Sequence, residues 1–442
     1  MNPIHVGLLG IGTVGSGTFE VLRRNQEEIQ RRAGREIRIT AVADLDVARA
    51  RRIVGDAARV TPDARSVIND PSIDIVVELI GGVGIAKTLV LEAIAAGKHV
   101  VTANKALLAL HGTEIFAAAA ERGVMVAFEA AVAGGIPIIK ALREGLTANR
   151  IEGVVGIVNG TTNFILSEMR AKGIDFATAL ADAQRLGYAE ADPTFDVMGI
   201  DAAHKATVMS ALAFGVPVQF EKAYVEGIAD LQAADIAYAE QLGYRLKLLA
   251  IAKRRSDLGG IELRVHPTLV PAGRLIANVE GAMNAVMVQA DAVGTTLYYG
   301  KGAGAEPTAS AVIADLVDVT RLHTADPHHR VPHLAFQPGS MQDTPILRIA
   351  DVVTAFYLRL VVADKAGVLA RITGILAEHD ISIDALLQRP SRHPQGEGAA
   401  RTDVIILTHD TVEGRMAGAM AQMQALPTVL APIVRIRKEE LR

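Results

Sequence analysis

The feature that most constrains the fold of this chain is a glycine pattern near its N-terminus, in the stretch IHVGLLGIGTVGSGTFEVL. The pattern Gly10-x-Gly12-x-x-Gly15 follows a predicted strand and precedes a predicted helix. The first glycine permits a tight turn, the second lets a pyrophosphate approach the backbone, and the third lets the helix pack closely on the strand. The stretch therefore predicts a dinucleotide site; the alternative is that the glycines only make a tight turn. The predicted loop comprises these glycines together with Ile11, Thr13 and Val14.

The end of the second predicted strand bears on the form of the dinucleotide. In ITAVAD the strand ends at Asp44, whose carboxylate is suited to the adenosine ribose hydroxyls of NAD. Three arginines that follow closely are suited to the 2′-phosphate that distinguishes NADP; they are Arg49, Arg51 and Arg52. The residues therefore leave both cofactors open.

The length and composition of the chain limit its class. At 442 residues it is too long for one core, and we expect two to four domains. The residues are 50% apolar and 21% charged, as in ordinary globular proteins, and the net charge is −4. Lysines and arginines are scattered, so we expect neither a nucleic-acid surface nor a polybasic membrane segment. No apolar run approaches the ~20 residues needed to span a bilayer, and we expect no signal peptide.

The chain contains no cysteine. This excludes disulfides, cysteine-ligated metals and thiol nucleophiles, and it fits a reducing cytoplasm, where we expect the protein to work. An aldehyde dehydrogenase that forms a thioester on a cysteine is excluded for the same reason.

Three regions of the chain differ in their patterns. Residues 1–135 alternate short apolar runs such as DIVVELI with helical patterns, which predicts a parallel sheet with helices on both faces. Residues 136–320 mix helices such as FATALADAQRLG with strands such as GIELRVHPTLV. Residues 356–439 give the order β-α-β-β-α-β, which predicts a small separate domain of the split ferredoxin-like kind.

Two segments have the composition of irregular structure. DPHHRVPHLAFQPGSMQDTP, residues 326–345, is predicted to link the second and third regions. SRHPQGEGAA, residues 391–400, is predicted to be a mobile hairpin tip.

A lysine follows one of the strands predicted in the first region. In HVVTANKALLA, Lys105 lies just beyond the C-terminal end of the strand, where ligands bind in open α/β sheets. A cation at the start of a helix is disfavoured by the helix dipole, which is a mild indication of function. The alternative is a solvated loop lysine, and this stretch alone does not decide between the two.

The stretch GYAEADPTFDVMGIDAAHK, residues 187–205, places carboxylates before a lysine and then enters the apolar segment TVMSALAFG. Asp201 and Lys205 are four residues apart on a helix predicted from about Gly199, so they share one face. They form either a surface ion pair of little worth, or a buried pair whose charge or proton is used. The residues leave both possibilities open. The other carboxylates of the stretch are Glu190, Asp192 and Asp196.

These motifs resemble those of the homoserine dehydrogenase family in order and spacing. The resemblance covers essentially the full length and includes VTANK at 101–105, VNGTTNFIL at 158–166 and GKGAGAEPTASAV at 300–312. It implies a Rossmann-type nucleotide-binding domain, to which a segment at about 305–330 returns, an α+β substrate and dimerisation domain, and a C-terminal ferredoxin-like ACT domain. The implied activity is the NAD(P)-dependent interconversion of L-homoserine and L-aspartate 4-semialdehyde, on the route to threonine, methionine and isoleucine. We expect the monofunctional form of the enzyme.

The resemblance also implies roles for the charged residues. Lys205 matches the proton donor of the family, and a cationic lysine also stabilises the alkoxide that forms during reduction. Lys105 matches a lysine that binds substrate, contacts the cofactor and shares in proton transfer. Glu190 matches the carboxylate that receives the substrate ammonium, while Asp196 and Asp201 line the same pocket and orient Lys205.

Further positions are implied for ligands other than the substrate. Gly302 resembles an additional cofactor contact. The family holds a sodium-like monovalent cation by backbone carbonyls, which here correspond to Glu129, Val132, Gly134 and Ile136. Ala43 stands where the family often has an arginine, so a preference for NADP should be weaker in this chain.

The C-terminal region resembles a domain that binds amino-acid effectors at its first strand-to-helix turn. That turn is ADKAGVLARI, residues 363–372, and the implied contacts are Asp364, Gly367 and Val368. Threonine is the expected effector; alternatively, Gly367 only starts the helix and the domain only dimerises. We expect a homodimer or a homotetramer. The alternative to an enzyme is a catalytically inactive amino-acid sensor, which would have no reason to keep both lysines and their carboxylates.

Overall fold

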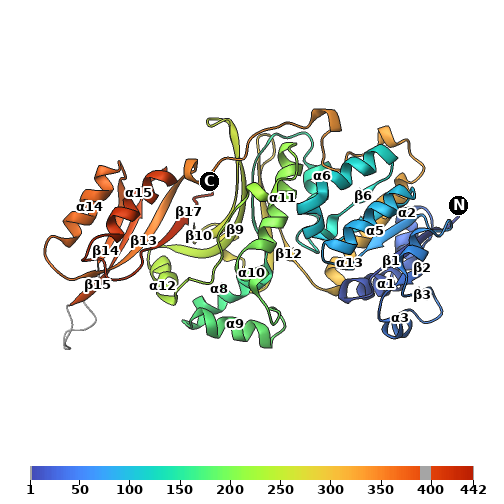
Figure 1. Ribbon diagram of the computed structural model, residues 1–442, viewed down its shortest axis with the longest axis horizontal. Coiled ribbons are helices and arrows are strands. Elements are labelled where there is room, and N and C mark those ends of the chain that lie inside the picture. Colours follow the sequence, from blue (N-terminus) through green and yellow to red (C-terminus); the bar gives the residue numbers. More distant parts are fainter. Residues whose placement is uncertain (1, 389–399, 442) are drawn as a thin grey trace.

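The computed structural model describes residues 2–388 and 400–441, which form three parts along one axis (Figure 1). The first part contains a six-stranded parallel sheet in the order β3-β2-β1-β4-β5-β6. The order reverses between β1 and β4, which is where a dinucleotide binds in folds of this kind. The predicted parallel sheet is confirmed, and β3 is a short edge strand that the sequence did not indicate. The strands are β1 (Ile4–Leu9), β2 (Ile37–Ala43), β3 (Arg59–Thr61), β4 (Ile75–Glu78), β5 (His99–Thr102) and β6 (Val126–Ala127).

The helices of the first part include one that comes from much later in the chain. Helix α13 packs against α1 so closely that a Cβ on Gly17 would lie 2.7 Å from the carbonyl oxygen of Ala305. Its apolar residues join the core formed by β1 and β2. The chain therefore leaves the first part, builds the second, and returns. The helices are α1 (Thr13–Arg24), α2 (Gln26–Ala33), α3 (Val47–Val54), α4 (Ala64–Ile68), α5 (Gly84–Ala95), α6 (Lys105–Arg122) and α13 (Ala305–Leu322).

The second part is an antiparallel sheet in the order β12-β11-β7-β9-β10, with helices on one face. Its most buried helix is α11, in which every residue from Asp201 to Phe214 is buried. A glycine in the left-handed conformation lies at each end of this helix, Gly199 with φ 80° and Gly215 with φ 66°. Glycine suits both positions because a residue without Cβ adopts this conformation without strain. The strands are β7 (Ile151–Ile157), β8 (Tyr224–Val225), β9 (Tyr244–Arg255), β10 (Gly260–Pro271), β11 (Met283–Ala290) and β12 (Gly294–Lys301); the helices are α7 (Ile138–Lys140), α8 (Gly160–Lys172), α9 (Phe176–Arg185), α10 (Thr194–Val197), α11 (Ile200–Phe214) and α12 (Ala233–Gln241).

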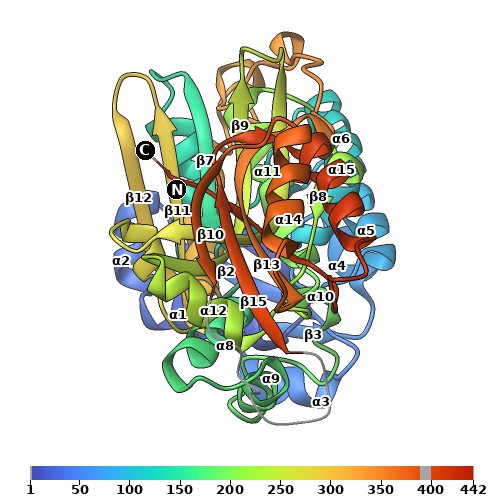
Figure 2. The ribbon, with the colours of Figure 1, turned by 90° about the vertical axis from the view of Figure 1, so that its left-hand side faces the viewer.

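The third part has the predicted β-α-β-β-α-β order, with the sheet order β17-β13-β15-β14 and two helices on one face. It was expected to be separate, but β17 pairs in parallel with β10, so one sheet continues through the second and third parts (Figure 2). All but one of the residues predicted to form the hairpin tip, 391–400, lie outside the described residues. The elements are β13 (Val353–Ala363), α14 (Val368–Glu378), β14 (Ile383–Gln388), β15 (Arg401–Thr408), β16 (Thr411–Val412), α15 (Glu413–Gln424) and β17 (Val434–Lys438).

The segment that links α13 to β13 contacts all three parts, and it crosses the molecule in orange in Figure 1. Arg330 donates to the carbonyl oxygen of Gly123 at 2.8 Å, next to α6. The backbone N–H of Gln342 donates to the carbonyl oxygen of Gly215 at 2.7 Å, at the end of α11. Among the described residues, no helix is long and apolar enough to cross a membrane.

Candidate active site

Two lysines from different parts of the molecule converge on one buried carboxylate. The Nζ of Lys205 lies 2.7 Å from Oδ2 of Asp201, and the Nζ of Lys105 lies 3.1 Å from Oδ1 of the same residue. The side chains of Asp201 and Lys205 are only 5% and 10% exposed, so the surface ion pair considered for them is ruled out. Because α6 presents Lys105 and α11 presents Lys205, the cluster lies where the first and second parts meet.

The ammonium of Lys205 has fewer protein partners than it has protons. It donates to Asp201 and, at 2.6 Å, to the carbonyl oxygen of Val158. An ammonium has three N–H donors, so within the described chain one donor of Lys205 has no protein acceptor. A buried cation with one spare donor is suited to donate a proton to a bound ligand.

Asn159 organises the carboxylates of the cluster, and sequence reasoning did not single it out. Its Nδ2 donates to Asp196 at 2.7 Å and to Asp201 at 2.9 Å. Its Oδ1 accepts the backbone N–H of Thr162 at 2.8 Å and so caps α8. The only signal in the sequence was an asparagine before a helical pattern in VNGTTNFIL, which predicts a cap and not a site.

A second set of polar residues fixes the position of Lys105. Asn104 caps α6 by accepting from Leu107 at 3.1 Å, and its Nδ2 donates to the carbonyl oxygen of Gly82 at 2.7 Å. Thr102, at the end of β5, donates at 2.7 Å to Glu78, a fully buried carboxylate at the end of β4. The C-terminal ends of two neighbouring strands are thereby joined directly beside Lys105.

The electrostatics of the cluster follow from its burial. Burial alone would raise the pKa of Asp201, but the two lysines and Asn159 outweigh it and hold that pKa well below its ordinary value. Burial lowers the pKa of Lys205, with Asp201 opposing this effect and Lys105 adding to it. Burial raises the pKa of Asp196, and the nearby Asp201 carboxylate adds to the rise. The cluster thus pairs an ionised carboxylate with a lysine that loses its proton more readily than usual.

The glycine loop has the shape that a dinucleotide requires. Gly10 has φ 94°, and a Cβ there would lie 2.7 Å from the carbonyl oxygen of Leu79. A Cβ on Gly15 would lie 2.2 Å from the carbonyl oxygen of Gly10, whereas a Cβ on Gly12 would meet nothing within 4 Å. Gly12 immediately precedes α1, where Thr13 is exposed and the first N–H groups have no partner within the helix. The residues present therefore fit a bound pyrophosphate.

Asp44 is tied to that loop by its side chain. It accepts the backbone N–H of Ile11 at 2.7 Å and that of Asp46 at 2.8 Å. A second carboxylate, Asp46, therefore stands beside Asp44 at the end of β2. The three arginines that follow are exposed on α3.

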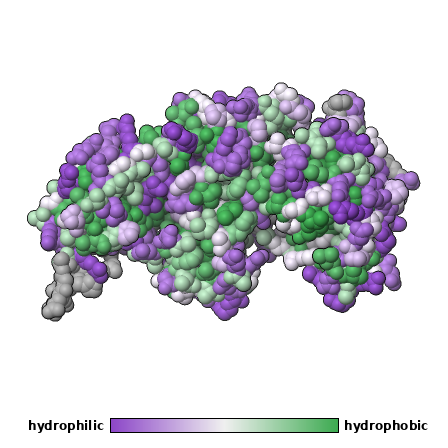
Figure 3. Space-filling model, viewed as in Figure 1, coloured by the Kyte–Doolittle hydropathy of each residue, from purple (hydrophilic) through white to green (hydrophobic). Residues whose placement is uncertain are grey.

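Glu190 is not part of the hydrogen-bonded cluster. It is exposed, and its carboxylate has no hydrogen-bond or ion-pair partner among the described residues. The loop around it also exposes apolar side chains, of which Tyr188 is 46% and Phe195 40% exposed. Figure 3 shows apolar residues gathered over this middle part of the molecule, between more polar ends.

The segment implied as a cation site has two free carbonyl groups. Ala133 and Gly134 both have left-handed backbones, with φ 55° and φ 50°. Within the described chain, the carbonyl oxygens of Val132 and Gly134 accept no hydrogen bond although both residues are buried, so these carbonyls fit a cation. No group of three or more His, Cys, Asp or Glu side chains is placed to hold a metal in residues 2–388 and 400–441.

The glycines implied for a further cofactor contact and for the effector differ in the space around them. Gly302 packs against a side chain, because a Cβ there would lie 1.9 Å from Nδ2 of Asn284. Gly367 starts α14 with φ 89° and has open space where a Cβ would be. Beside it, Asp364 is exposed and Val368 is buried.

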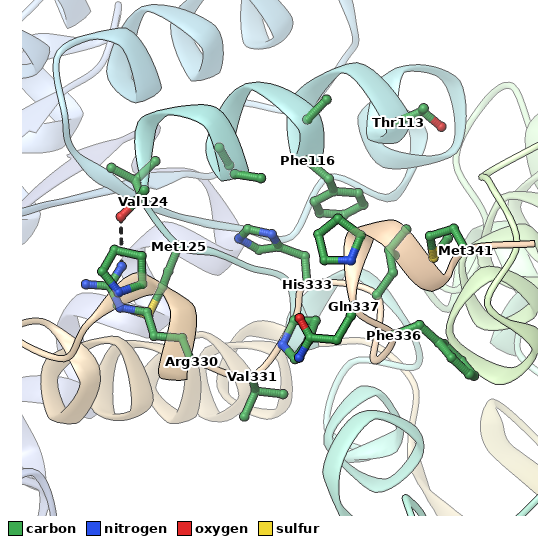
Figure 4. A pocket seen from close by; sticks show the side chains of 18 of the residues that line it. Thr113, Phe116, Val124, Met125, Arg330, Val331, His333, Phe336, Gln337 and Met341 are labelled. Atoms are coloured by element: carbon green, nitrogen blue, oxygen red, sulfur yellow. Dashed lines mark hydrogen bonds between the residues drawn. The ribbon is translucent and has the colours of Figure 1, made fainter.

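A cavity of about 500 Å³ lies apart from the two lysines, between α6 and the linker (Figure 4). His333 stacks on Phe116 within it, with ring centroids 5.6 Å apart. Burial lowers the pKa of His333 to about 4, so its ring is neutral near pH 7. The cavity is lined mainly by apolar side chains and by neither Asp201 nor either lysine, so it is not the reaction site.

Comparisons with known proteins agree with this geometry. The family model for homoserine dehydrogenase matches residues 137–317, the model for its NAD binding domain matches 10–129, and the ACT domain model matches 356–427. A homoserine dehydrogenase of Pseudomonas aeruginosa is 58% identical and covers 100% of both chains.

Solved structures are similar over the same range. A homoserine dehydrogenase from Thiobacillus denitrificans has a TM-score of 0.95 and 64% identity, covering 100% of this chain and 99% of the other. A hyperthermophilic archaeal homoserine dehydrogenase in complex with NADPH has a TM-score of 0.62 and 26% identity, covering 74% of this chain and 99% of the other.

Proposed function

The chain belongs to the homoserine dehydrogenase family of oxidoreductases, and on that premise we propose that Lys205 and Lys105 serve the interconversion of L-homoserine and L-aspartate 4-semialdehyde. The observation that carries this proposal is the convergence of both lysines on the buried Asp201. Two lysines on the single carboxylate Asp201 place positive charge where an oxygen gains negative charge in the reaction.

Each group of the cluster has a distinct part in the proposed reaction. The bound nicotinamide supplies or accepts the hydride. Lys205 uses its spare N–H donor to protonate the alkoxide oxygen in reduction, and its neutral amine takes the hydroxyl proton in oxidation. Asp201 holds the amine in place through both directions, and Lys105 keeps a second positive charge at the site.

The carboxylates of the loop bind the substrate's ammonium in this proposal. Glu190 supports this role because its exposed carboxylate has no protein partner among the described residues. Glu190→Gln removes the charge and nearly keeps the shape, so it should raise KM for homoserine by about tenfold or more with little change in kcat. A large fall in kcat at unchanged KM would contradict a binding role.

We further propose that the cofactor is NAD or NADP and that carbonyls of Glu129, Val132, Gly134 and Ile136 hold a sodium-like cation. The NADPH complex of the archaeal relative supports NADP, whereas the adjacent carboxylates of Asp44 and Asp46 favour NAD because they repel a 2′-phosphate. The free carbonyls of the loop support the cation. We also propose a homo-oligomer that works in the cytoplasm, in threonine, methionine and isoleucine biosynthesis.

The direct test of the function is turnover. Purified protein with homoserine and either NAD or NADP should produce the absorbance of the reduced nicotinamide. The inactive sensor would bind an amino acid but give no such absorbance with either cofactor. Omitting sodium and potassium from the buffer tests the cation.

The C-terminal domain is proposed to bind threonine at the turn formed by Asp364, Gly367 and Val368. The open space at Gly367 supports a small ligand there. Gly367→Asn keeps a left-handed residue but fills the space, so inhibition by threonine should be lost while basal turnover is kept. Gly34→Asn, at another open glycine with φ 81°, is the matched control and should keep the inhibition. Inhibition that persists in Gly367→Asn would place the effector elsewhere.

A further inference from the structure

A buried arginine of the C-terminal domain reaches a carboxylate close to the active site. Arg437, on β17, is fully buried, and its Nη1 donates to Glu226 of the second part at 2.8 Å. The hydroxyl of Tyr224 lies between them, accepting from Arg437 at 3.1 Å and donating to Glu226 at 2.8 Å. On its other side Arg437 is paired with Glu413 of its own domain, at 2.8 Å.

The backbone around Glu226 is hydrogen-bonded to β10 on one side and to Val197 on the other. The backbone N–H of Glu226 donates to the carbonyl oxygen of Val265 on β10 at 2.8 Å, and that of Ile228 donates to the carbonyl oxygen of Val197 at 2.8 Å. Between them, a Cβ on Gly227 would lie 2.3 Å from the carbonyl oxygen of Val197. The two backbones are therefore in direct contact, and any shift of residues 226–228 displaces the turn at Val197.

The turn at Val197 lies next to the two carboxylates of the candidate site. Asp196 lies immediately before Val197, and the N–H of Gly199 donates to the carbonyl oxygen of Asp196 at 2.9 Å. Asp201 follows two residues later, in the first turn of α11. Asn159 bonds both carboxylates, so the backbone position of this turn determines how they face Lys205.

We propose that Glu226 is a positioning residue for the reaction. Its ion pair with Arg437 presses residues 226–228 against the turn, so the docked C-terminal domain helps to set the geometry of Asp196, Asp201 and Lys205. This inference rests on the proposed roles of Asp201 and Lys205. It also connects the C-terminal domain to the candidate active site through a short series of contacts, by which that domain influences turnover.

The alternative is that Glu226 only helps to hold two domains together, and a second ion pair of the same interface provides the control. Arg359 of β13 donates to Asp235 of α12 at 2.6 and 3.0 Å. Tyr357 also donates to Asp235, at 3.0 Å. This pair is buried and joins the same two parts, but neither of its charged residues bonds to residues 194–201.

The experiment compares Glu226→Gln with Asp235→Asn in the full-length enzyme. Both should lower the midpoint of thermal unfolding, and the control should do so at least as much, because Arg437 keeps Glu413 after the first change. Only Glu226→Gln should lower kcat/KM for homoserine, by about tenfold, since misplacing catalytic groups by a fraction of an ångström is costly. It should also shift the rising limb of the pH profile of kcat/KM for homoserine, which reports the pKa of Lys205, while KM for the nicotinamide cofactor stays unchanged.

Several outcomes decide the proposal. Equal kcat/KM and equal pH profiles in the two variants would overturn it, and Glu226 would then be a docking residue only. If Glu226→Gln does not fold, Tyr224→Phe removes the bridging hydroxyl without a change of charge and should show the same effect more weakly; an unaltered profile there would overturn the proposal as well. Lys205→Ala serves as the reference, because its retention of activity would refute the proposed function whatever Glu226 does.

Discussion

Two buried clusters of charge in this molecule use different cations. In the candidate active site, lysines surround Asp201; at the contact between the second and third parts, Arg437 is held by Glu413 and Glu226. Burial lowers the pKa of Lys205. Burial acts in the same direction on Arg437, but its two carboxylates outweigh it and raise the pKa above the ordinary value.

The difference follows from the chemistry of the two side chains. A lysine is a point charge that gives up its proton when desolvated, whereas a guanidinium stays charged and binds carboxylates in a fixed two-pronged geometry. Arg437 has protein acceptors on all three nitrogens of its guanidinium, while Lys205 keeps a spare donor. The site proposed for proton transfer thus uses lysine, whereas the contact between two domains uses arginine.

The largest expected effect is on the lysine cluster. Lys205→Ala removes the proposed proton donor and should lower kcat by about 10²–10⁴, the usual range for general acid–base groups. Lys205→Arg sharpens the comparison, because arginine keeps the charge but does not give up a proton at accessible pH, so kcat should fall nearly as far. Steady-state kinetics in both directions checks this. Near-normal turnover of Lys205→Arg at neutral pH would show that charge alone is enough.

The pH dependence of turnover should reveal the lowered pKa of Lys205. In the proposed role, reduction of the aldehyde requires the ammonium of Lys205, so its rate should fall as pH rises through that pKa. Oxidation of homoserine requires the neutral amine, so its rate should rise over the same range, each by up to tenfold per pH unit. Rate profiles between pH 6 and 10 measure this, and parallel profiles in the two directions would contradict the assignment.

An arginine at the domain contact should affect stability and not chemistry. Arg264 on β10 is 2% exposed; it donates to Glu262 at 2.8 and 3.0 Å and also to Glu439, near the C-terminus. Arg264→Lys keeps the charge but loses the two-pronged geometry, at an expected cost of about 1–3 kcal/mol. Thermal or denaturant unfolding should show the loss while kcat changes less than twofold. A proportionate fall in kcat would mean that this contact also positions the site.

The sequence predicted the lysine cluster of the candidate active site better than the arginine cluster at the domain contact. The spacing of Asp201 and Lys205 on a predicted helix placed them on one face, since a helix repeats locally. Asn159 and Glu78 were missed because their bonds join residues 37, 42 and 24 positions apart, which only the fold brings together. The burial of Arg437 depends on the pairing of β17 with β10, and no local pattern records a pairing between strands so far apart in the chain.

The fold, too, was predicted where its elements are local in sequence and was missed where distant segments pair. Glycine spacing and alternating apolar runs predicted the strands and following helices of the nucleotide-binding part up to about residue 135, because each of these strand–helix units is local in sequence. The continuous sheet was not predicted, since residues 356–439 have the pattern of a complete domain whether or not an edge strand finds a partner. The short strand β3 pairs only at the sheet edge and has too few residues to give a pattern.

The smallest expected effect comes from a buried carboxyl that lacks a close cation. Asp201 and Asp315 are both buried, but burial, reinforced by the nearby Glu129 carboxylate, raises the pKa of Asp315 to about 8. One oxygen of Asp315 accepts the backbone N–H of Glu129 at 2.7 Å, and the other has no hydrogen-bond partner. Asp315 is therefore protonated in the folded protein near neutral pH and ionised in the unfolded chain.

This difference gives a stability that depends on pH with a definite sign. A group whose folded pKa is raised contributes its full stability below the unfolded pKa, and the contribution is lost as pH rises from about 4 towards 8. Asp315→Asn can still accept from the N–H of Glu129 but does not ionise, so it should escape this loss. The advantage of its unfolding midpoint over that of the unchanged protein should be larger near pH 8 than near pH 5, by a few degrees. Thermal unfolding followed at both pH values checks the difference, and Asp201→Asn, which removes a paired carboxylate, should lower the midpoint at both. A variant at 315 whose advantage is no larger at pH 8 than at pH 5 would show that the carboxylate is ionised and paired after all.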